Sequence, residues 1–486
     1  MLARLRNNPV FETIFFAGYF AYKKLTCKDT RADKKCRKTS RSIVEKADIK
    51  SLKEYHIAII CDEFTYVNFS KECHLHVLTP NNWRTVFAEN DIDLFLCESA
   101  WNGLNMHKQC WRGKIYKNHN VLFETRKILF RILDYCKENH IPTAFWNKED
   151  PTYFGNQKYD FVDTALHFQY IFTTAAECIS QYEALNHCDV FVMPFGFSPQ
   201  IYNPLFTEEK QNRAIFAGSW YGENAERCQA ETELFQKVLD TNIPLVIYDR
   251  HSSSKRKDRQ YPKRFLQYVK DSLSQETLSA EIKRSKYAIN INTVTNSETM
   301  LARRIYELMA SNVYIISNEA KAMQQFVGRY STTQSAVPVD TEQICRTNVD
   351  YVFQHCTNKK RLEDMLCHMQ LPVLCDDVKI AVYCEQTEAD MELSGDEYSL
   401  SFVQALSDID KSQYQYFIVW DGYTKLNIAK LLPHFVYLDT LYGVCAKEQS
   451  LYQIVEDNEN ENVLFPIVLL NNLLADKNTI LKKYHV

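Results

Sequence analysis

At 486 residues the chain is long enough for about two to four domains with substantial cores. A hydrophobic content of 45% and a charged content of 24% are typical of globular proteins, and a net charge of −4 gives no global reason to expect a nucleic-acid partner. The 16 cysteines show neither a C-x-x-C pair nor zinc-ligand spacing, so we expect buried, reduced thiols in a cytoplasmic protein. Glycine is scarce, and the absence of a Walker loop and of G-x-G-x-x-G removes the main support for kinase, ATPase and dinucleotide-oxidoreductase functions.

The first 41 residues are strongly basic, with eleven Lys or Arg, three acids and a net charge of +8. The aromatic-rich stretch Val10–Leu25 contains an unbroken apolar run of about ten residues, which is too short to span a membrane. It lacks the small-residue cleavage site of a signal peptide. We therefore expect a helix and linker over residues 1–50. Two alternatives remain for this segment. Residues 1–41 could make shallow contact with an anionic inner membrane face, or the helix could pack on the protein body.

From Tyr55 onward, apolar strand-like runs alternate with longer amphipathic segments. This alternation predicts a parallel, doubly wound sheet in a first Rossmann-like domain over residues 51–204, the acceptor domain. The expected helices include Val121–Asn139 and Ala175–Leu185. The expected strands are His56–Cys61, Ile92–Cys97, Pro142–Trp146, Tyr170–Thr173 and Val190–Met193.

A second series of the same kind begins after Asn203-Pro204 and predicts another Rossmann-like domain over residues 205–370. Helices are expected at Ala225–Asp240, Glu276–Ser285 and about Met300–Ala310. The expected strands are Ala214–Ala217, Pro244–Tyr248, Ala288–Asn292 and Val313–Ser317.

Residues 371–486 open with fresh strand patterns at Cys375–Glu385 and Tyr416–Asp421, which predict a small third α/β domain. The D-x-D sequence at Asp408 to Asp410 lies before the second of these strands, in a Ser/Asp/Lys-rich stretch. We interpret it as a solvated loop, not as a metal site.

Charge is concentrated on the helix expected to follow the Ala288–Asn292 strand. Arg303 and Glu307 are one helical turn apart, and Arg304 and Glu307 share a face as well. Cations and a carboxylate at a helix N-terminus beyond a strand end suit a nucleoside diphosphate, with phosphate on the cations and ribose on the carboxylate. The alternative is a surface helix with an i,i+4 salt bridge.

The segment Ala302–Ser311, preceded by Asn290–Val294, resembles the A-R-R-x-[FY]-E-L-x-A-S signature of the CgeB-type glycosyltransferases, whose C-terminal halves belong to the GT-B group 1 superfamily. Matching segments span roughly residues 56–320. They are Glu98–Trp101, Phe145–Pro151, Phe172–Thr174, Pro194–Pro199, Phe216–Tyr221 and Ile247–Arg250. The resemblance implies a GT-B fold, in which two Rossmann-like doubly wound parallel-sheet domains face a cleft. The third domain faintly resembles a truncated GT-A domain.

The resemblance implies transfer of a sugar from a nucleoside-diphosphate sugar to a hydroxyl of a glycan or lipid-linked glycan, in bacterial capsule, lipopolysaccharide or wall-polymer synthesis. It implies no cofactor and no metal, so the chain's own cations would offset the diphosphate charge. Glu307 matches the ribose-binding Glu, whereas Glu298 is one residue out of the spacing found in many retaining relatives. The expected donor-binding residues are Glu307, Arg303, Arg304, Asn292, Thr293, Gly218, Arg227 and Arg250.

For the acceptor half, the expected residues lie in and around the W-N-K-E-D-P loop. If transfer inverts the anomeric centre, Asp150 or Glu149 is the expected base, with Arg304 stabilising the leaving group; if it retains configuration, no base is needed. Lys148 belongs to the same loop, whose alternative interpretation is a turn with a Lys-Glu bridge. Trp101 and Trp146 are candidates for stacking on sugar, with core packing as the alternative.

Two other functions remain open at this point. One is another GT-B reaction on the same donor, epimerisation or hydrolysis, which needs further acid and base groups. The other is a non-catalytic module of the same fold in a surface-polymer assembly complex. We expect a cytoplasmic protein that contacts the inner membrane face peripherally and has no nucleic-acid partner.

Overall fold

The computed structural model describes residues 50–104, 108–206, 208–254, 256–326, 341–374, 378–384, 398–424, 426–438, 441–446, 452, 454–476 and 479–486. The predicted N-terminal helix and its membrane contact lie outside these residues. The chain divides into two compact units, 1–46 and 47–486, and the description below concerns the second. None of the helices in the described ranges is both long and apolar enough to cross a membrane.

The first sheet is six-stranded, parallel throughout, and ordered β2-β1-β3-β4-β5-β6. Its strands are β1 (His56–Ile60), β2 (His74–Val77), β3 (Leu94–Glu98), β4 (Thr143–Asn147), β5 (Tyr170–Thr173) and β6 (Val190–Val192). The intervening helices are α3 (Glu63–Phe69), α4 (Trp83–Glu89), α5 (Lys127–Glu138), α6 (Phe161–Ala165) and α7 (Ile179–Ala184). Every residue of β3 and β4 is buried, as expected where helices cover both faces of a parallel sheet.

The second sheet has five parallel strands in the order β11-β10-β7-β8-β9. The strands are β7 (Gln211–Gly218), β8 (Leu245–Asp249), β9 (Val269–Asp271), β10 (Ser285–Asn290) and β11 (Tyr314–Ser317). The helices are α8 (Ala225–Asp240), α9 (Gln275–Lys283), α10 (Arg304–Ala310) and α11 (Thr341–His355).

Each of these two sheets contains a switch point, where consecutive connections run to opposite sides of the first strand. In the first sheet it lies between β1 and β3, and in the second between β7 and β10. Ligands of doubly wound folds bind beyond the carboxyl ends of the strands at such points. These two edges are therefore where the sequence-predicted site residues are to be sought.

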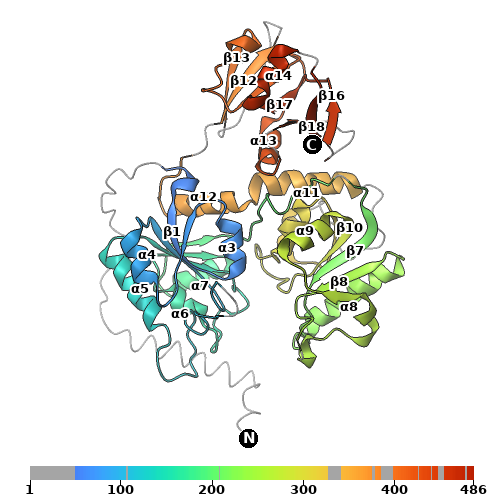
Figure 1. The fold of residues 1–486 in the computed structure, drawn as a ribbon. Coiled ribbons are helices and arrows are strands. Elements are labelled where there is room, and N and C mark those ends of the chain that lie inside the picture. The colour runs from blue at the N-terminus through green and yellow to red at the C-terminus, as the bar shows by residue number, and fades with distance from the viewer. Residues whose placement is uncertain are drawn as a thin grey trace. The chain divides into compact units, whose positions relative to one another are not determined.

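The third sheet is mixed and seven-stranded, in the order β13-β12-β14-β17-β15-β18-β16. Its strands are β12 (Val378–Cys384), β13 (Tyr398–Val403), β14 (Tyr416–Trp420), β15 (Tyr442–Cys445), β16 (Ile454–Asp457), β17 (Val463–Pro466) and β18 (Leu481–His485). Its helices are α13 (Ile428–Leu431) and α14 (Leu470–Ala475). Figure 1 labels some of the elements of each sheet. The predicted fold class, two Rossmann-like parallel sheets and a further α/β sheet, is confirmed.

Helix α12 (Asn358–His368) closes the core of the first sheet, although it follows the whole of the second sheet in the sequence. Leu362, Met365 and Leu366 are buried in the same apolar cluster as Ile57 and Trp146. The chain also forms isolated bridges from Lys50 to Val373 and from Phe197 to Thr357. Short 3-10 helices complete the described structure: η1 (Leu52–Glu54), η2 (Ala176–Cys178), η3 (Lys257–Arg259), η4 (Lys263–Tyr268), η5 (Lys321–Phe326), η6 (Leu406–Asp408), η7 (Leu432–Val436) and η8 (Ile467–Leu469).

In the D-x-D sequence, Asp408 ends η6 and Asp410 lies in the turn that follows, and both aspartates are exposed. Asp410 accepts hydrogen bonds from the backbone and hydroxyl of Ser412 and from the side chain of Gln413. These local bonds agree with the interpretation as a solvated loop. The cysteines in the described ranges are free thiols, most of them buried or partly buried.

Candidate functional site

The Glu307 carboxylate lies at the start of α10, fully buried between two arginines. Arg303 Nε is 3.1 Å from Glu307 Oε1, and Arg304 Nη1 is 2.6 Å from Oε2. The arginine side chains remain 30% and 22% exposed. The predicted cations and carboxylate therefore do come together, and their salt bridge is a buried one. The carboxylate fixes the two guanidinium groups, which keep a face toward solvent.

Tyr202, which the sequence did not single out, is buried beside this group. Burial raises the pKa of Tyr202 to about 12, and the Glu307 charge raises it further while Arg304 opposes the rise. The phenol therefore remains neutral. Its position just after the P-F-G-F-S-P segment was the only signal in the sequence.

Asn292 organises the loop between β10 and α10. Its Oδ1 accepts a hydrogen bond from the backbone N–H of Ala302 at 3.1 Å. Its backbone exchanges a pair of hydrogen bonds with the Asn318 side chain, at 2.8 and 2.9 Å. Because Asn292 is buried and its side chain is engaged in this way, its geometry supports positioning of the loop more than contact with a ligand. Thr293, next in the chain, is exposed.

Arg227, on α8, links this loop to the interior. Its Nη1 donates to Thr293 Oγ1 at 2.6 Å, and its Nη2 lies 2.9 Å from Glu231 Oε1. Glu231 is fully buried, and in the described part of the chain its Oε2 receives no hydrogen bond. Burial raises the pKa of Glu231 to about 7 against the opposing charge of Arg227. The i,i+4 spacing of Arg227 and Glu231 was visible in the sequence, but the burial of the carboxylate was not.

Gly218 ends β7, and Arg250 directly follows the neighbouring strand β8. A Cβ at Gly218 would stand 2.4 Å from the ring of Phe216, so the packing of Phe216 alone already requires glycine there. Arg250 is exposed and its Nη2 lies 2.5 Å from the hydroxyl of Tyr221. The Tyr221 ring also has the Arg227 guanidinium 5.2 Å from its centroid. Three of the predicted donor residues thus adjoin one another at the edge of the second sheet.

The switch point of the first sheet carries a network of acids that the sequence did not reveal. Asp62, two residues after β1, accepts hydrogen bonds from the backbone N–H groups of Trp101, Asn102 and Gly103 at 2.7 to 3.0 Å. Buried Glu98, at the end of β3, accepts from the backbone of Asp62 at 2.7 Å. An acid just after a buried strand was the available signal for Asp62.

Lys148 joins this network by pairing with Glu98, at 2.7 Å, and not with the neighbouring Glu149. Its Nζ is also 3.2 Å from the hydroxyl of Thr65, which itself donates to Glu98. The loop therefore does contain a Lys-Glu bridge, but the glutamate comes from another strand. Lys148 is largely buried, at 13% side-chain exposure.

The two candidate bases occupy different environments. Asp150 is fully buried and accepts from Asn147, Thr173 and Tyr182 at 2.8 to 2.9 Å. Burial raises the pKa of Asp150 to about 7, against the effect of these hydrogen bonds. Glu149 is partly exposed and its Oε1 accepts from Trp101 Nε1 at 2.8 Å. Burial also raises the pKa of Glu149. Of the two carboxylates, Glu149 is the one a substrate can reach.

The two tryptophans differ in the same way. Trp146 is buried, its ring stacks on Phe69, and its Nε1 donates to the Met193 carbonyl at 3.0 Å. Core packing, the alternative interpretation, describes it. Trp101 is partly exposed and its ring meets those of neighbouring aromatic residues edge-on. These neighbours are Tyr153, Tyr159 and Phe161.

Residues of the two site edges are connected by direct contacts. The Arg303 guanidinium lies 3.1 Å from the ring centroid of Phe64, on α3. Thr299, in the loop before α10, donates to the Thr174 carbonyl at 2.8 Å and accepts from the Ala176 N–H at 2.9 Å. Exposed Glu298 pairs instead with Lys321 at 2.8 Å. Glu298 therefore does not share the environment of Glu307.

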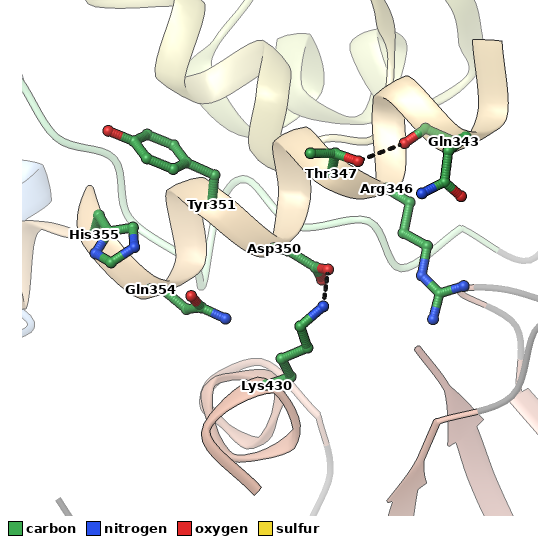
Figure 2. A pocket seen from close by; sticks show the side chains of 8 residues that line it. All are labelled: Gln343, Arg346, Thr347, Asp350, Tyr351, Gln354, His355 and Lys430. Atoms are coloured by element: carbon green, nitrogen blue, oxygen red, sulfur yellow. Dashed lines mark hydrogen bonds and ion pairs between the residues drawn. The ribbon is translucent and has the colours of Figure 1, made fainter. Parts of the chain in front are cut away.

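A separate hollow of about 370 Å³ lies between α11 and α13 (Figure 2). The Asp350–Lys430 ion pair, 2.5 Å long, crosses it. None of the predicted site residues lines it.

No protein-family model matches the chain, and no curated protein matches it. Solved structures of glycosyltransferases resemble it at low identity. An alpha-glucosyltransferase in complex with UDP and a 13-mer DNA containing a HMU base is 9% identical, with a TM-score of 0.45 over 65% of this chain and 99% of that chain. Anabaena Alr3699/HepE in complex with UDP and glucose is 9% identical, with a TM-score of 0.38 over 66% and 96%. TarM is 9% identical, with a TM-score of 0.37 over 57% and 54%. Similarity this low carries no argument about substrate.

Proposed function

We propose that this protein transfers a sugar from a nucleoside-diphosphate sugar to a hydroxyl group of an acceptor. The observation that carries the proposal is the buried Glu307 carboxylate clamped between Arg303 and Arg304, beyond the strand ends at the switch point of the second sheet. Glu307 is as fully buried as Asp150, so in this proposal it acts by fixing the two guanidinium groups, whose exposed faces meet the donor. Fixed guanidinium groups are suited to the charge that develops on a departing diphosphate.

Arg227 and Arg250 extend this cationic edge along β7 and β8. Arg227 is held by Glu231 and Thr293, so little reorganisation is needed when it meets a phosphate. In this proposal the chain's own cations offset the diphosphate charge and no metal is required. Thr293 and the backbone at Gly218 contact the donor.

Glu149 is the proposed base if the reaction inverts configuration. It is the partly exposed carboxylate of the loop, and its elevated pKa suits a group that takes up a proton from the acceptor. Asp150, enclosed by three donors, positions the loop from beneath. Trp101 orients Glu149 through its ring N–H. A bacterial cell-surface glycan is the proposed acceptor class, and contact of the basic residues 1–41 with the membrane remains part of the proposal.

Calorimetric titration with UDP, GDP, CDP and TDP tests the donor site. We expect one diphosphate to bind best and its Kd to rise about tenfold or more, about 1.4 kcal/mol, in Glu307→Gln. Glu298→Gln is the matched control, because Glu298 is an exposed carboxylate nearby in the sequence and pairs with Lys321 at the surface. If the folded wild type binds none of the four nucleotides, the proposal is wrong and a non-catalytic module replaces it.

A further inference from the structure

The segment that follows β8 concentrates positive charge. Residues 250–264 contain seven Lys or Arg and one acid, Asp258, a net charge of +6 in a chain whose total is −4. The charge is therefore a local property of this segment and does not reflect a generally basic protein. A local excess of one sign, beside a candidate site, attracts ligands of the other sign.

Most of these cations are not neutralised by carboxylates. Arg256 pairs with Asp258, and Arg259 pairs with Glu223 at 2.6 Å. Lys257, Lys263 and Arg264 are exposed and have no carboxylate partner within the described part of the chain. Arg250 bonds the neutral hydroxyl of Tyr221. Even after Glu223 is counted, the described surface of the segment carries an excess of positive charge.

The segment is a built part of the fold. Tyr261 and Phe265 are buried, and both rings pack against Phe235 of α8. The Gly222 N–H donates to the Asp258 carbonyl at 2.8 Å. With these anchors the exposed cations are presented on two short 3-10 helices, η3 and η4.

The same anchors turn the aromatic rings inward. Proteins that hold single-stranded nucleic acid combine cations with aromatic rings on which the bases stack. Here Tyr261 and Phe265 are both occupied in the core, at 4% and 1% exposure. Neither ring can therefore stack on a base, and the surface ring of Tyr221 already carries the guanidinium groups of Arg227 and Arg259. The surface recognises repeated negative charge, and duplex nucleic acid, which offers phosphates without stacking, is the alternative that the test separates.

The segment also begins at the candidate donor site. Arg250 is its first residue, and Arg250 and Arg227 share Tyr221 as a common neighbour. Arg259 lies on the same ring, 4.2 Å from its centroid. A chain bound along the segment would thus lead directly to the edge where the diphosphate is proposed to bind.

We propose that the described cations of this segment, among them Arg250, Lys257, Lys263 and Arg264, form the acceptor-binding surface and that the acceptor is a polyanionic glycan, with carboxylate or phosphodiester groups along its chain. This inference rests on the proposed glycosyl transfer and adds the chemical class of the acceptor. Arg and Lys on short, anchored turns suit repeated carboxylate or phosphate groups, and the binding is expected to weaken with salt.

The test compares two variants with the same change of charge. K257E/K263E reverses two unpaired cations of the segment, and K127E/R131E reverses two exposed cations of α5 as the control. Binding of fluorescently labelled hyaluronate and phosphomannan is measured at salt concentrations from about 50 to about 300 mM. Neutral dextran, double-stranded DNA and vesicles containing an anionic lipid are measured alongside. UDP affinity is determined for each variant.

We expect both anionic glycans to bind the wild type and the control with salt-dependent affinity, and K257E/K263E to lose about tenfold or more in affinity, about 1.4 kcal/mol. UDP affinity is expected to be the same in all three proteins. Equal glycan binding by K257E/K263E, equal binding of dextran, or binding of DNA or vesicles alone would overturn the inference. If no nucleotide binds the wild type, the transferase proposal fails, and the glycan result still stands as a separate measurement.

Discussion

The guanidinium of Arg303 lies directly over the ring of Phe64, 3.1 Å from its centroid. Arg303 belongs to the helix turn beside Glu307, whereas Phe64 belongs to α3 of the first sheet. The arginine is therefore held from two directions, by a carboxylate of its own helix and by an aromatic face of another. A cation fixed in this way is pre-organised for a phosphate, and the contact makes residues of the first sheet relevant to the donor site.

Phe64→Leu should weaken this arrangement. The substitution keeps an apolar side chain but removes the ring face, so we expect a loss of about 1 kcal/mol in stability from the cation–π contact. Diphosphate affinity should fall several-fold because Arg303 gains freedom. Urea unfolding and calorimetry measure the two effects. Tyr66→Leu, on the same helix, provides the control, and an equal loss of nucleotide affinity there would contradict the assignment.

Arg227→Ala should destabilise the protein in a pH-dependent way. It leaves the fully buried Glu231 carboxylate without its counter-ion, and removing one partner of a buried pair typically costs about 3 kcal/mol or more. Since the Glu231 pKa is raised to about 7, the carboxyl is neutral at pH 5.5 and the cost should be smaller there than at pH 8.

The double variant Arg227→Ala with Glu231→Gln should recover much of the stability at pH 8, because the buried charge is gone. Urea unfolding at both pH values measures this. A loss from Arg227→Ala that is equal at pH 5.5 and pH 8 would show that the Glu231 charge is not its cause.

Asp150 should make the wild type less stable as pH rises. Its folded-state pKa, about 7, lies above the ordinary value of 3.8. The stability it contributes is therefore fully present below about pH 4 and is lost as pH rises through 7, by an amount on the order of 4 kcal/mol. Asp150→Asn removes this titration, and the hydroxyls of Thr173 and Tyr182 can rotate to suit the amide.

The comparison is the change in unfolding free energy between pH 4.5 and pH 7.5 in wild type and in Asp150→Asn. We expect the unfolding free energy to change less between these two pH values in Asp150→Asn than in the wild type. Parallel pH profiles for the two proteins would mean that Asp150 is ionised throughout.

Trp101→Phe should move the pH dependence of transfer. The ring N–H of Trp101 lowers the pKa of Glu149, so its removal should raise that pKa while leaving the aromatic packing in place. If Glu149 is the base, the acid limb of the rate profile moves to higher pH, because the base must lose its proton to act. Trp146→Phe, a buried position, serves as the comparison and should lower stability without moving the limb.

Most strands of the first two sheets could be located from sequence because they are short apolar runs, although neither β2 nor β9 was predicted. The predicted strand Tyr170–Thr173 and helix Ala225–Asp240 agree with the structure at both ends, whereas the strand predicted over Tyr416–Asp421 ends one residue earlier, at Trp420. β2 was missed, since His74–Val77 is an edge strand with two histidines and little apolar character. The helix expected from about Met300 begins at Arg304, because Asn292 holds the preceding residues in a loop by accepting from the Ala302 backbone.

The clamp on Glu307 could be predicted because its three members lie within five positions of one helix. The partners of Lys148 and Arg303 could not, since Glu98 and Phe64 are distant in the sequence and only the tertiary fold brings them near. Glu149 and Asp150 looked equivalent in the sequence, and so did Trp101 and Trp146, but in the structure one member of each pair is buried and the other is partly exposed. Which member of each pair faces a substrate depends on the packing of strands, which alternation of residues does not reveal.

The position of α12 has a consequence for biosynthesis. Ile57 and Trp146 leave the ribosome long before Leu362 and Leu366, which share their apolar cluster. During synthesis this side of the first sheet therefore stays uncovered until the residues of the second sheet and then α12 have been made. A nascent chain stalled before residue 358 would expose this apolar surface, which is the kind of surface that chaperones recognise. A protein fragment that contains the first sheet alone should therefore not fold stably unless α12 is supplied, in the same chain or as a separate peptide.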